Sequence, residues 1–284
     1  MRRARDIRRF LDEDVGRGDV TSDRVVPPDA RARGRIVAKQ DAVVAGLAEA
    51  AEVFGALGVR FDPAARDGGR VTAGAAVAAV EGNARAILKG ERVALNIIQR
   101  MSGIATMTRR VVEAGRSVNP RLVVAATRKT TPGFRAYEKR AVEVGGGDAH
   151  RHGLDDMVLV KDNHIRVAGG LEAAMDALFH RAASGGGRPL AHKVEVEVSS
   201  LEDALSACRL GAEIVMLDNM PLEDLETTSR SVKGAFPAVV VEVSGNITAE
   251  NVGRVAAFAD VVSVGALTHS APACDFHLKV EPIR

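Results

Sequence analysis

The feature that most constrains the fold is an alternation of short apolar runs with amphipathic stretches, which begins near residue 121. Repeated strand–helix units of this kind predict a parallel sheet covered by helices. The pattern does not distinguish an open doubly wound sheet from a barrel that is two strands short of eight. The six predicted strands are Leu122–Thr127, Met157–Val160, Lys193–Val198, Glu213–Leu217, Val239–Val243 and Val261–Val264.

The residues up to about 92 have a different pattern, which predicts a small α+β domain. A strand is predicted over Arg35–Ala45, followed by a helix whose apolar residues recur at 3–4 spacing from Leu47 to Leu57. Short strands are predicted next, at Val59–Phe61, Val71 and Ala76–Val80. A long helix then begins near Glu91 and keeps one face apolar as far as Val112, which suits a connection between two domains.

Composition excludes several classes of protein. The 284 residues suit a barrel plus a smaller domain, and a net charge of +2 gives no overall attraction to nucleic acid or membranes. No apolar run follows the five arginines of Met1–Phe10, and none elsewhere reaches membrane-spanning length, so we expect neither a secretory signal nor a membrane span. Cys208 and Cys274 are too few for a disulfide framework or a zinc site, and a cytoplasmic location fits them.

All six predicted strands end in polar, charged or glycine-rich residues that a protein core would not choose. In α/β barrels the active site is built at the carboxyl ends of the strands. We therefore predict an enzyme whose strand ends bind a phosphate-rich, multiply anionic small substrate. The endings are Thr127-Arg128-Lys129, Lys161-Asp162-Asn163-His164, Glu195 with Glu197, Asp218-Asn219, Ser244-Gly245-Asn246 and Gly265-Ala266.

The strand over Lys193–Val198 alternates charged residues with valines, so Lys193, Glu195 and Glu197 share one face. We expect these charges to point into the barrel interior; a solvated edge strand is the alternative interpretation. Glu197 and Asp218 offer the hard oxygen ligands that magnesium prefers together with substrate phosphates. The glycine-containing endings of the last two strands, at Ser244–Asn246 and at Gly265-Ala266, predict phosphate-binding turns.

The segment from Arg128 to Lys161 is rich in cations, which require anionic partners. Its basic residues are Arg128, Lys129, Arg135, Lys139, Arg140, His150, Arg151, His152 and Lys161. We expect Arg135, Lys139 and Arg140 to be solvated helix residues.

Several of these motifs together resemble the quinolinate phosphoribosyltransferase family, which is the carboxylating type of nicotinate-nucleotide pyrophosphorylase. The resemblance covers nearly the whole chain. Its central motifs are Thr127–Gly133, His150-Arg151 and Val160–His164. Further matching motifs are Glu13–Thr21, Glu91–Asn96, Ser102–Ala105, Val194–Val198, Leu217–Asn219, Ser244–Ile247 and Ser263–Thr268.

The resemblance implies an N-terminal α/β sandwich domain over residues 1–110, with the tail 270–284 packing on it. It also implies an incomplete α/β barrel over residues 111–269 and a homodimer with shared active sites. The implied reaction joins quinolinate to phosphoribosyl pyrophosphate, with magnesium, and gives nicotinate mononucleotide, pyrophosphate and carbon dioxide in de novo NAD synthesis.

The resemblance also implies roles for individual residues. Arg92 of the partner subunit would bind quinolinate together with Arg128, His150, Arg151 and Lys161. The phosphoribosyl pyrophosphate side would comprise Lys129, Glu197, Asp218, Ser244, Gly245, Asn246, Gly265 and Ala266. Of these residues, Lys129, Lys161, Glu197 and Asp218 are the expected catalytic group, and Glu197 and Asp218 are the expected metal ligands.

Three alternative functions remain open on the sequence. A sibling phosphoribosyltransferase of the same fold could act on another acceptor. Lys161 could instead be the Schiff-base lysine of a barrel aldolase. A sugar-phosphate sensor without catalytic activity is the third alternative.

Overall fold

The computed structural model describes residues 2–183 and 192–283, which form two compact units. The first unit comprises Met1–Arg109, Tyr137–Gly146 and Ala271–Arg284, and the second comprises Arg110–Ala136 and Gly147–Ser270. The sequence-based division assigned residues 111–269 as a whole to the barrel domain. In the structure Tyr137–Gly146 groups with the first unit instead.

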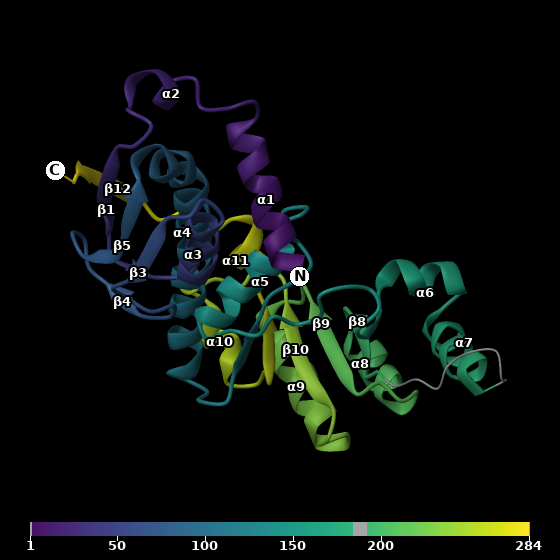
Figure 1. The fold of residues 1–284 in the computed structure, drawn as a ribbon. Helices are drawn as coiled ribbons and strands as arrows, with labels where there is room; N and C mark the ends of the chain where they lie inside the picture. Colours follow the sequence, from purple (N-terminus) through teal and green to yellow (C-terminus); the bar gives the residue numbers. More distant parts are fainter. Residues whose placement is uncertain (1, 184–191, 284) are drawn as a thin grey trace. The chain divides into compact units, whose positions relative to one another are not determined.

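The first unit contains a four-stranded antiparallel sheet in the order β12-β1-β5-β3 (Figure 1). Along β1 buried residues such as Ile36 alternate with exposed arginines, so one face of the strand packs and the other meets solvent. The C-terminal strand β12 pairs with β1, from Ala32 opposite Pro282 to Ala38 opposite Phe276. The strands of the unit are β1 (Arg31–Ala38), β2 (Ala42–Val43), β3 (Arg60–Pro63), β4 (Arg70–Val71), β5 (Ala76–Asn83) and β12 (Phe276–Pro282).

The helices associated with this part of the chain are α1 (Arg2–Val15), α2 (Ser22–Val25), α3 (Leu47–Ala56), α4 (Ala84–Arg116) and α5 (Arg135–Val144). Helix α4 begins seven residues before the predicted start at Glu91, so that prediction was wrong. The Asn83 side chain accepts a hydrogen bond from the Ala86 amide at 3.2 Å, which satisfies one amide of the first turn. Position 90, inside α4, is a glycine where a larger residue would be crowded: a Cβ there would come within 3.0–3.2 Å of Leu57 and Phe54.

The second unit is built on six parallel strands, and each predicted strand is present with ends within two residues of the prediction. They are β6 (Val123–Ala125), β7 (Val158–Val160), β8 (Val194–Val198), β9 (Ile214–Asp218), β10 (Val240–Ser244) and β11 (Val261–Ser263). Their order is β6-β11-β10-β9-β8-β7, so the last strand pairs with the first. Strands β7 to β11 are neighbours in chain order. The sheet is therefore an incomplete barrel that lacks hydrogen-bonded pairing between β6 and β7, and the doubly wound alternative is excluded.

The helices of the second unit connect these strands. They are α6 (Asp162–Ala168), α7 (Leu171–Ala183), α8 (Leu201–Arg209), α9 (Leu222–Ala235), α10 (Val252–Ala256) and α11 (Ala266–His269). Val194, Val196 and Val198 are buried along β8. Because β8 lies between β7 and β9, the edge-strand interpretation of this segment was wrong. None of the helices in the described parts of the chain has the length and apolar character of a membrane span.

Gly103 of α4 provides a test of packing in the first unit. A Cβ at this position would lie 2.0 Å from the Pro272 carbonyl oxygen, so Gly103→Ala forces the backbone to move. We expect this substitution to destabilise the protein by about 2 kcal/mol or more, as overpacked sites do. Gly55 of α3 has no atom within 4 Å of its Cβ position, so Gly55→Ala should be neutral or stabilise by up to about 1 kcal/mol. Urea unfolding of both variants measures the difference, and equal effects would contradict this account of the packing.

Candidate active site

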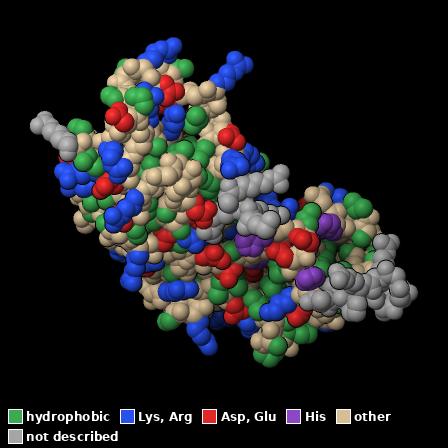
Figure 2. All heavy atoms as spheres, in the orientation of Figure 1, with side chains coloured by type: hydrophobic (Ala, Val, Ile, Leu, Met, Phe, Trp, Pro, Cys, Tyr) green, Lys and Arg blue, Asp and Glu red, His purple; other side chains and the backbone are tan. Residues whose placement is uncertain are grey.

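Parallel pairing brings the carboxyl ends of the central strands of the second unit to one edge. Ser244 lies opposite Asp218 on one side and opposite Ser263 on the other, and Ser263 lies opposite Ala125. Residues that follow these positions therefore emerge side by side. Figure 2 shows acidic side chains and histidine gathered over the region of β8 to β10.

Strained backbone marks this region. Among the described residues, the non-glycine residues with positive φ are His150 at 52°, Asn219 at 53° and Asn246 at 52°. Such conformations persist where surrounding contacts hold them, and they are concentrated at functional sites. The His150 amide donates to Asp148 Oδ1 at 2.6 Å, and the Asn219 amide donates to the Ser244 carbonyl at 3.0 Å. Asn219 lies one residue after the end of β9 and Asn246 two residues after the end of β10, in segments that the sequence predicted as part of the site.

Three predicted cations of the second unit have environments suited to an anionic ligand. The Arg128 Nε atom is buried and has no hydrogen-bond partner. Burial, and next the positive charge of Arg128, lower the pKa of the Arg151 guanidinium. Lys161 Nζ forms an ion pair with Glu197 Oε2. A buried donor without a partner, beside a second guanidinium, favours a ligand with more than one negative charge.

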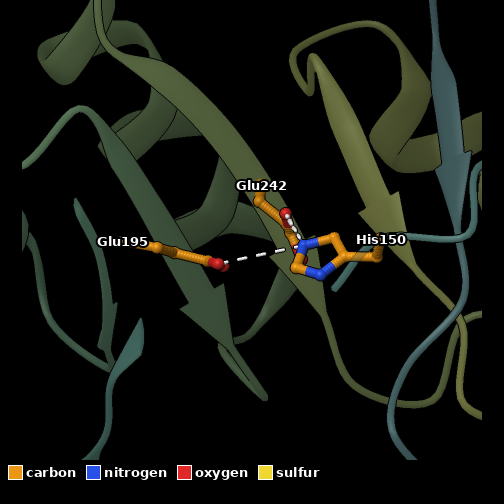
Figure 3. A group of neighbouring side chains, drawn as sticks. All are labelled: His150, Glu195 and Glu242. Carbon is orange, nitrogen blue, oxygen red and sulfur yellow. Dashed lines mark hydrogen bonds and ion pairs between the residues drawn. The ribbon is translucent and has the colours of Figure 1, made fainter. Parts of the chain in front are cut away.

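Two buried glutamates flank His150 (Figure 3). Its Nε2 atom lies 3.3 Å from Glu242 Oε2 and 3.8 Å from Glu195 Oε2. The other Glu242 oxygen, Oε1, accepts a hydrogen bond from the Ser263 hydroxyl, whereas neither Glu195 oxygen has a hydrogen-bond partner. Burial and then the neighbouring Glu242 charge raise the pKa of Glu195 to about 8. We refer to His150, Glu195 and Glu242 as the buried trio.

The two predicted phosphate turns differ in their surroundings. Gly245 has φ 105°, and a Cβ there would lie 2.3 Å from Asn219 Oδ1, so only glycine fits this turn. At the other turn, a Cβ on Gly265 would lie 3.1 Å from the Lys129 side chain. The Lys129 carbonyl accepts a hydrogen bond from Thr268 Oγ1 at 2.7 Å, which connects the first and last strand ends. Ala266 begins α11, which is a helix of only four residues.

Two sets of side chains have metal-ligating chemistry. The expected pair, Glu197 and Asp218, ends the adjacent strands β8 and β9, where Asp218 also accepts a hydrogen bond from Asn219 Nδ2 at 2.8 Å. Their hard oxygens suit magnesium that arrives with phosphates. The buried trio offers one nitrogen and two carboxylate oxygens within 4.8 Å of one another, which the sequence analysis did not predict.

A cavity of about 390 Å³ adjoins the buried trio. It is lined by His150, Arg151, Lys193 and Glu242, together with the first residues of β6, β9 and β11. Two of the predicted quinolinate-binding residues, His150 and Arg151, therefore line this cavity. Lys193 is exposed and lines this cavity together with His150 and Glu242.

The structure brings together most of the predicted residues of the second unit but gives others unexpected surroundings. Arg92 lies on α4 in the first unit, is exposed, and makes no hydrogen bond or ion pair with any described residue. The solvated roles expected for Lys139 and Arg140 were wrong. Lys139 is fully buried, and Arg140 forms ion pairs at 2.8 Å with Glu49 and Asp67 of the same unit.

Arg135 also differs from its expected solvated role. It donates hydrogen bonds at 2.9 Å to Thr130 Oγ1 and to the His152 carbonyl, so it connects two loops of the site. Sequence reasoning missed Glu242, and it included Ser263 only as the first residue of a family motif, without a role. Glu242 gave a usable signal, because it interrupts a run of valines in the same alternating manner as Glu195.

Comparisons with known proteins agree with the resemblance found in the sequence. The family model described as "Quinolinate phosphoribosyl transferase, C-terminal domain" matches residues 104–279, and the corresponding N-terminal domain model matches residues 19–102. The "Probable nicotinate-nucleotide pyrophosphorylase [carboxylating]" of Archaeoglobus fulgidus is 46% identical to this chain. That alignment covers 93% of this chain and 98% of the relative.

Two further relatives extend the comparison. The Homo sapiens "Nicotinate-nucleotide pyrophosphorylase [carboxylating]" is 43% identical, over 86% of this chain and 80% of its own. The crystal structure of NadC from Streptococcus pyogenes superposes with a TM-score of 0.89 at 39% identity, covering 98% of this chain and 96% of that one.

The raised pKa of Glu195 predicts a pH-dependent stability. Between pH 4.5, where this carboxyl ionises when unfolded, and about pH 8, the folded protein retains a proton that the unfolded chain has lost. Glu195 therefore makes the free energy of unfolding fall as pH rises through this range, by at most about 1.4 kcal/mol per pH unit. Glu195→Gln cannot ionise, so it should remove this contribution and become more stable than wild type toward pH 8.

Urea unfolding of both proteins at pH 5.5, 6.5 and 7.5 tests this prediction. Glu202→Gln, at an exposed position on α8, is the control and should follow the wild type. Parallel stability curves for Glu195→Gln and wild type would show that the buried carboxyl does not hold its proton.

Proposed function

The chain belongs to the quinolinate phosphoribosyltransferase family, and from this membership we propose how its residues divide the reaction. The enzyme transfers the phosphoribosyl group of phosphoribosyl pyrophosphate to quinolinate, with decarboxylation, in NAD biosynthesis. The observation that best supports the assignment of residues is the buried, unpartnered Nε of Arg128 beside Arg151.

Arg128, His150, Arg151 and Lys161 bind the two carboxylates of quinolinate. The substrate supplies two adjacent negative charges, which offset the repulsion between the guanidinium groups of Arg128 and Arg151. Each charge-assisted bond of this kind contributes about 1.5–3 kcal/mol. A sibling enzyme with a monocarboxylate acceptor would leave part of this positive charge uncompensated. The shared fold alone does not separate the two, since human nicotinic acid phosphoribosyltransferase superposes with a TM-score of 0.62 at 13% identity.

Lys129, Asp218 and the Ser244–Asn246 and Gly265-Ala266 turns bind phosphoribosyl pyrophosphate. Gly245 itself carries no side chain, so phosphate oxygens can approach the backbone amides of the first turn. Glu197 and Asp218 would hold Mg²⁺, which neutralises charge on the departing pyrophosphate when it is bound. At the Gly265-Ala266 turn the donors to phosphate are backbone amides and Lys129, because α11 has only four residues and is too short to contribute a helix dipole.

The chemistry requires mainly positioning and charge stabilisation from the protein. The pyridine nitrogen attacks the anomeric carbon of the ribose, and the bond to pyrophosphate breaks with its electron pair leaving on the pyrophosphate. The bond between C2 and its carboxylate then breaks, and the electron pair remains on C2 beside the positively charged ring nitrogen. C2 takes up a proton, which completes nicotinate mononucleotide.

The ion pair between Lys161 and Glu197 argues against the aldolase alternative. A Schiff-base lysine must present an amine that is free to attack a carbonyl, whereas the Lys161 amine is paired with a carboxylate. The same ion pair suits a lysine that binds an anion.

We also propose that the enzyme works in the cytoplasm as a homodimer with shared active sites. Cys208 and Cys274 are both buried and form no disulfide with each other, which fits a reducing compartment. Arg92 is an exposed cation without a partner among the described residues of its own chain. It is therefore available for a substrate bound by a second copy, as two-fold symmetry would allow for both sites.

Turnover of quinolinate tests the proposed function and its cation set together. We expect wild type to release carbon dioxide and pyrophosphate only when both substrates are present. Arg128→Ala and Arg151→Ala should each lower kcat/KM for quinolinate by about 10- to 150-fold, the equivalent of one charge-assisted bond. Arg209→Ala, at an exposed position on α8, is the matched control and should stay within about twofold of wild type.

Two outcomes would contradict these assignments. Absence of quinolinate turnover in wild type would reject the function. Equal losses in Arg151→Ala and Arg209→Ala would reject the cation set while leaving the function in place.

Shared active sites predict that two inactive variants complement each other. Arg92→Ala and Lys161→Ala should each be nearly inactive, because each lacks one of the quinolinate-binding cations. In a hybrid dimer, one site combines the intact Lys161 of one chain with the intact Arg92 of the other. Random 1:1 exchange makes half of the dimers hybrids with one complete site each, so activity should return to about one quarter of wild type.

Refolding a mixture of differently tagged variants provides the measurement, and isolation of doubly tagged dimers confirms exchange. If doubly tagged dimers form without activity beyond the sum of the parents, each site is complete within one chain.

A further inference from the structure

Glu242 is a buried charge whose two oxygens both have partners. Its side chain is 1% exposed and lies in the middle of β10. Oε1 accepts a hydrogen bond from Ser263 on β11, and Oε2 lies 3.3 Å from His150 Nε2. An ionised carboxylate only accepts hydrogen bonds, so the nitrogen that meets it must carry the proton. Ser263, Glu242 and His150 thus form a chain of contacts that runs from β11 through β10 to the loop before β7.

His150 is held at its backbone as well as at its ring. Its φ of 52° is unfavourable for a residue with a Cβ, and the Asp148 carboxylate holds its amide at 2.6 Å. Three consecutive glycines, Gly145–Gly147, precede this segment, and glycine gives the chain wide conformational freedom. A ring on such a loop needs a fixed acceptor if it is to meet a substrate in one orientation.

Glu195 is a natural comparison for Glu242, because both are fully or almost fully buried glutamates beside the same nitrogen. Glu195 is farther from Nε2, at 3.8 Å, and neither of its oxygens is hydrogen-bonded. Ser263 fixes the carboxylate of Glu242, and no described residue does the same for Glu195. Of the two, Glu242 alone has the geometry of an orienting acceptor.

We propose that Glu242, held by Ser263, is a positioning residue that fixes the ring plane and the Nε2 proton of His150. The proposal rests on the proposed function, in which His150 binds a quinolinate carboxylate. With Nε2–H directed at Glu242, that carboxylate accepts from Nδ1–H, so the ring that binds the substrate carries a proton on both nitrogens. Glu242 acts on the substrate only through His150, from the side of the ring that faces the sheet (Figure 3). Its removal should therefore weaken quinolinate binding while leaving the use of phosphoribosyl pyrophosphate intact.

The kinetic test compares isosteric substitutions in the full-length enzyme. We expect Glu242→Gln to raise KM for quinolinate about tenfold, with KM for phosphoribosyl pyrophosphate within twofold of wild type. Glu242→Ala should raise it further, because glutamine keeps an accepting oxygen and alanine does not. Glu195→Gln is the matched control and should change the quinolinate KM by less than twofold.

Ser263→Ala should raise KM for quinolinate about threefold, because it removes the bond that fixes Glu242. Its control is Ser229→Ala, which removes a different buried serine hydroxyl that donates to the Phe258 carbonyl. This control should leave both KM values within twofold of wild type. If Ser229→Ala raises the quinolinate KM as much as Ser263→Ala, the effect is general destabilisation and the role of Ser263 is rejected.

A spectroscopic readout separates positioning from structural support. Histidine ring nitrogens labelled with nitrogen-15 report which nitrogen carries the proton, and the spectrum of His150→Gln identifies the His150 signals. We expect wild type to show a protonated Nε2 at His150, and Glu242→Gln to shift those signals. Glu195→Gln should leave them in place.

The proposal is overturned if Glu242→Gln leaves the His150 signals unchanged, or if Glu195→Gln and Glu242→Gln raise the quinolinate KM equally. It is also overturned if purified enzyme carries stoichiometric transition metal on the buried trio, since a metal-bound Nε2 has no proton. Failure of the function itself looks different. Wild type would then not turn over quinolinate, while the spectra would still show whether Glu242 orients His150.

Discussion

Charge buried inside the second unit is tolerable only because each group has a neighbour that offsets its desolvation. Glu242 has Ser263 and His150, and Glu197 has Lys161. Glu195 has no hydrogen bond to either oxygen. It retains a proton instead, because burial raises its pKa to about 8. The buried acids lie close to the proposed site for an anionic substrate, so their neutralisation would also limit the repulsion that the substrate meets there.

That balance depends in turn on the closure of the sheet. Pairing of β11 with β6 places the first and last strands of the unit side by side, so Lys129 lies against the turn at Gly265. In a doubly wound sheet of the same strands the two turns would not meet. Backbone strain at His150, Asn219 and Asn246 shows where packing elsewhere supports unfavourable conformations, and all three lie close to this functional region.

The second unit could be predicted from sequence almost completely, because its strands are regular and chain neighbours become sheet neighbours. The polar residues at the strand ends could also be predicted to lie together, since residues that follow the carboxyl ends of parallel strands share one edge of the sheet. The contacts that each side chain makes could not be predicted from the sequence. The alternation around Glu242 indicates which face it occupies but not that Ser263, 21 residues later, contacts it. Lys139 looked solvated because its burial depends on packing in the first unit, which is discontinuous in the chain.

The pairing of β12 with β1 has a consequence for how the protein is made. The sheet of the first unit takes its edge strand from Phe276–Pro282, while β1 begins at Arg31. During synthesis on the ribosome, β1 leaves the ribosome long before its neighbour β12 has been made. One of its edges stays unpaired until Phe276–Pro282 has been translated, and unpaired edges attract other strands. The exposed arginines Arg31, Arg33 and Arg35 give the unpaired strand β1 a positive charge, which repels β1 of identical nascent chains on the same polysome.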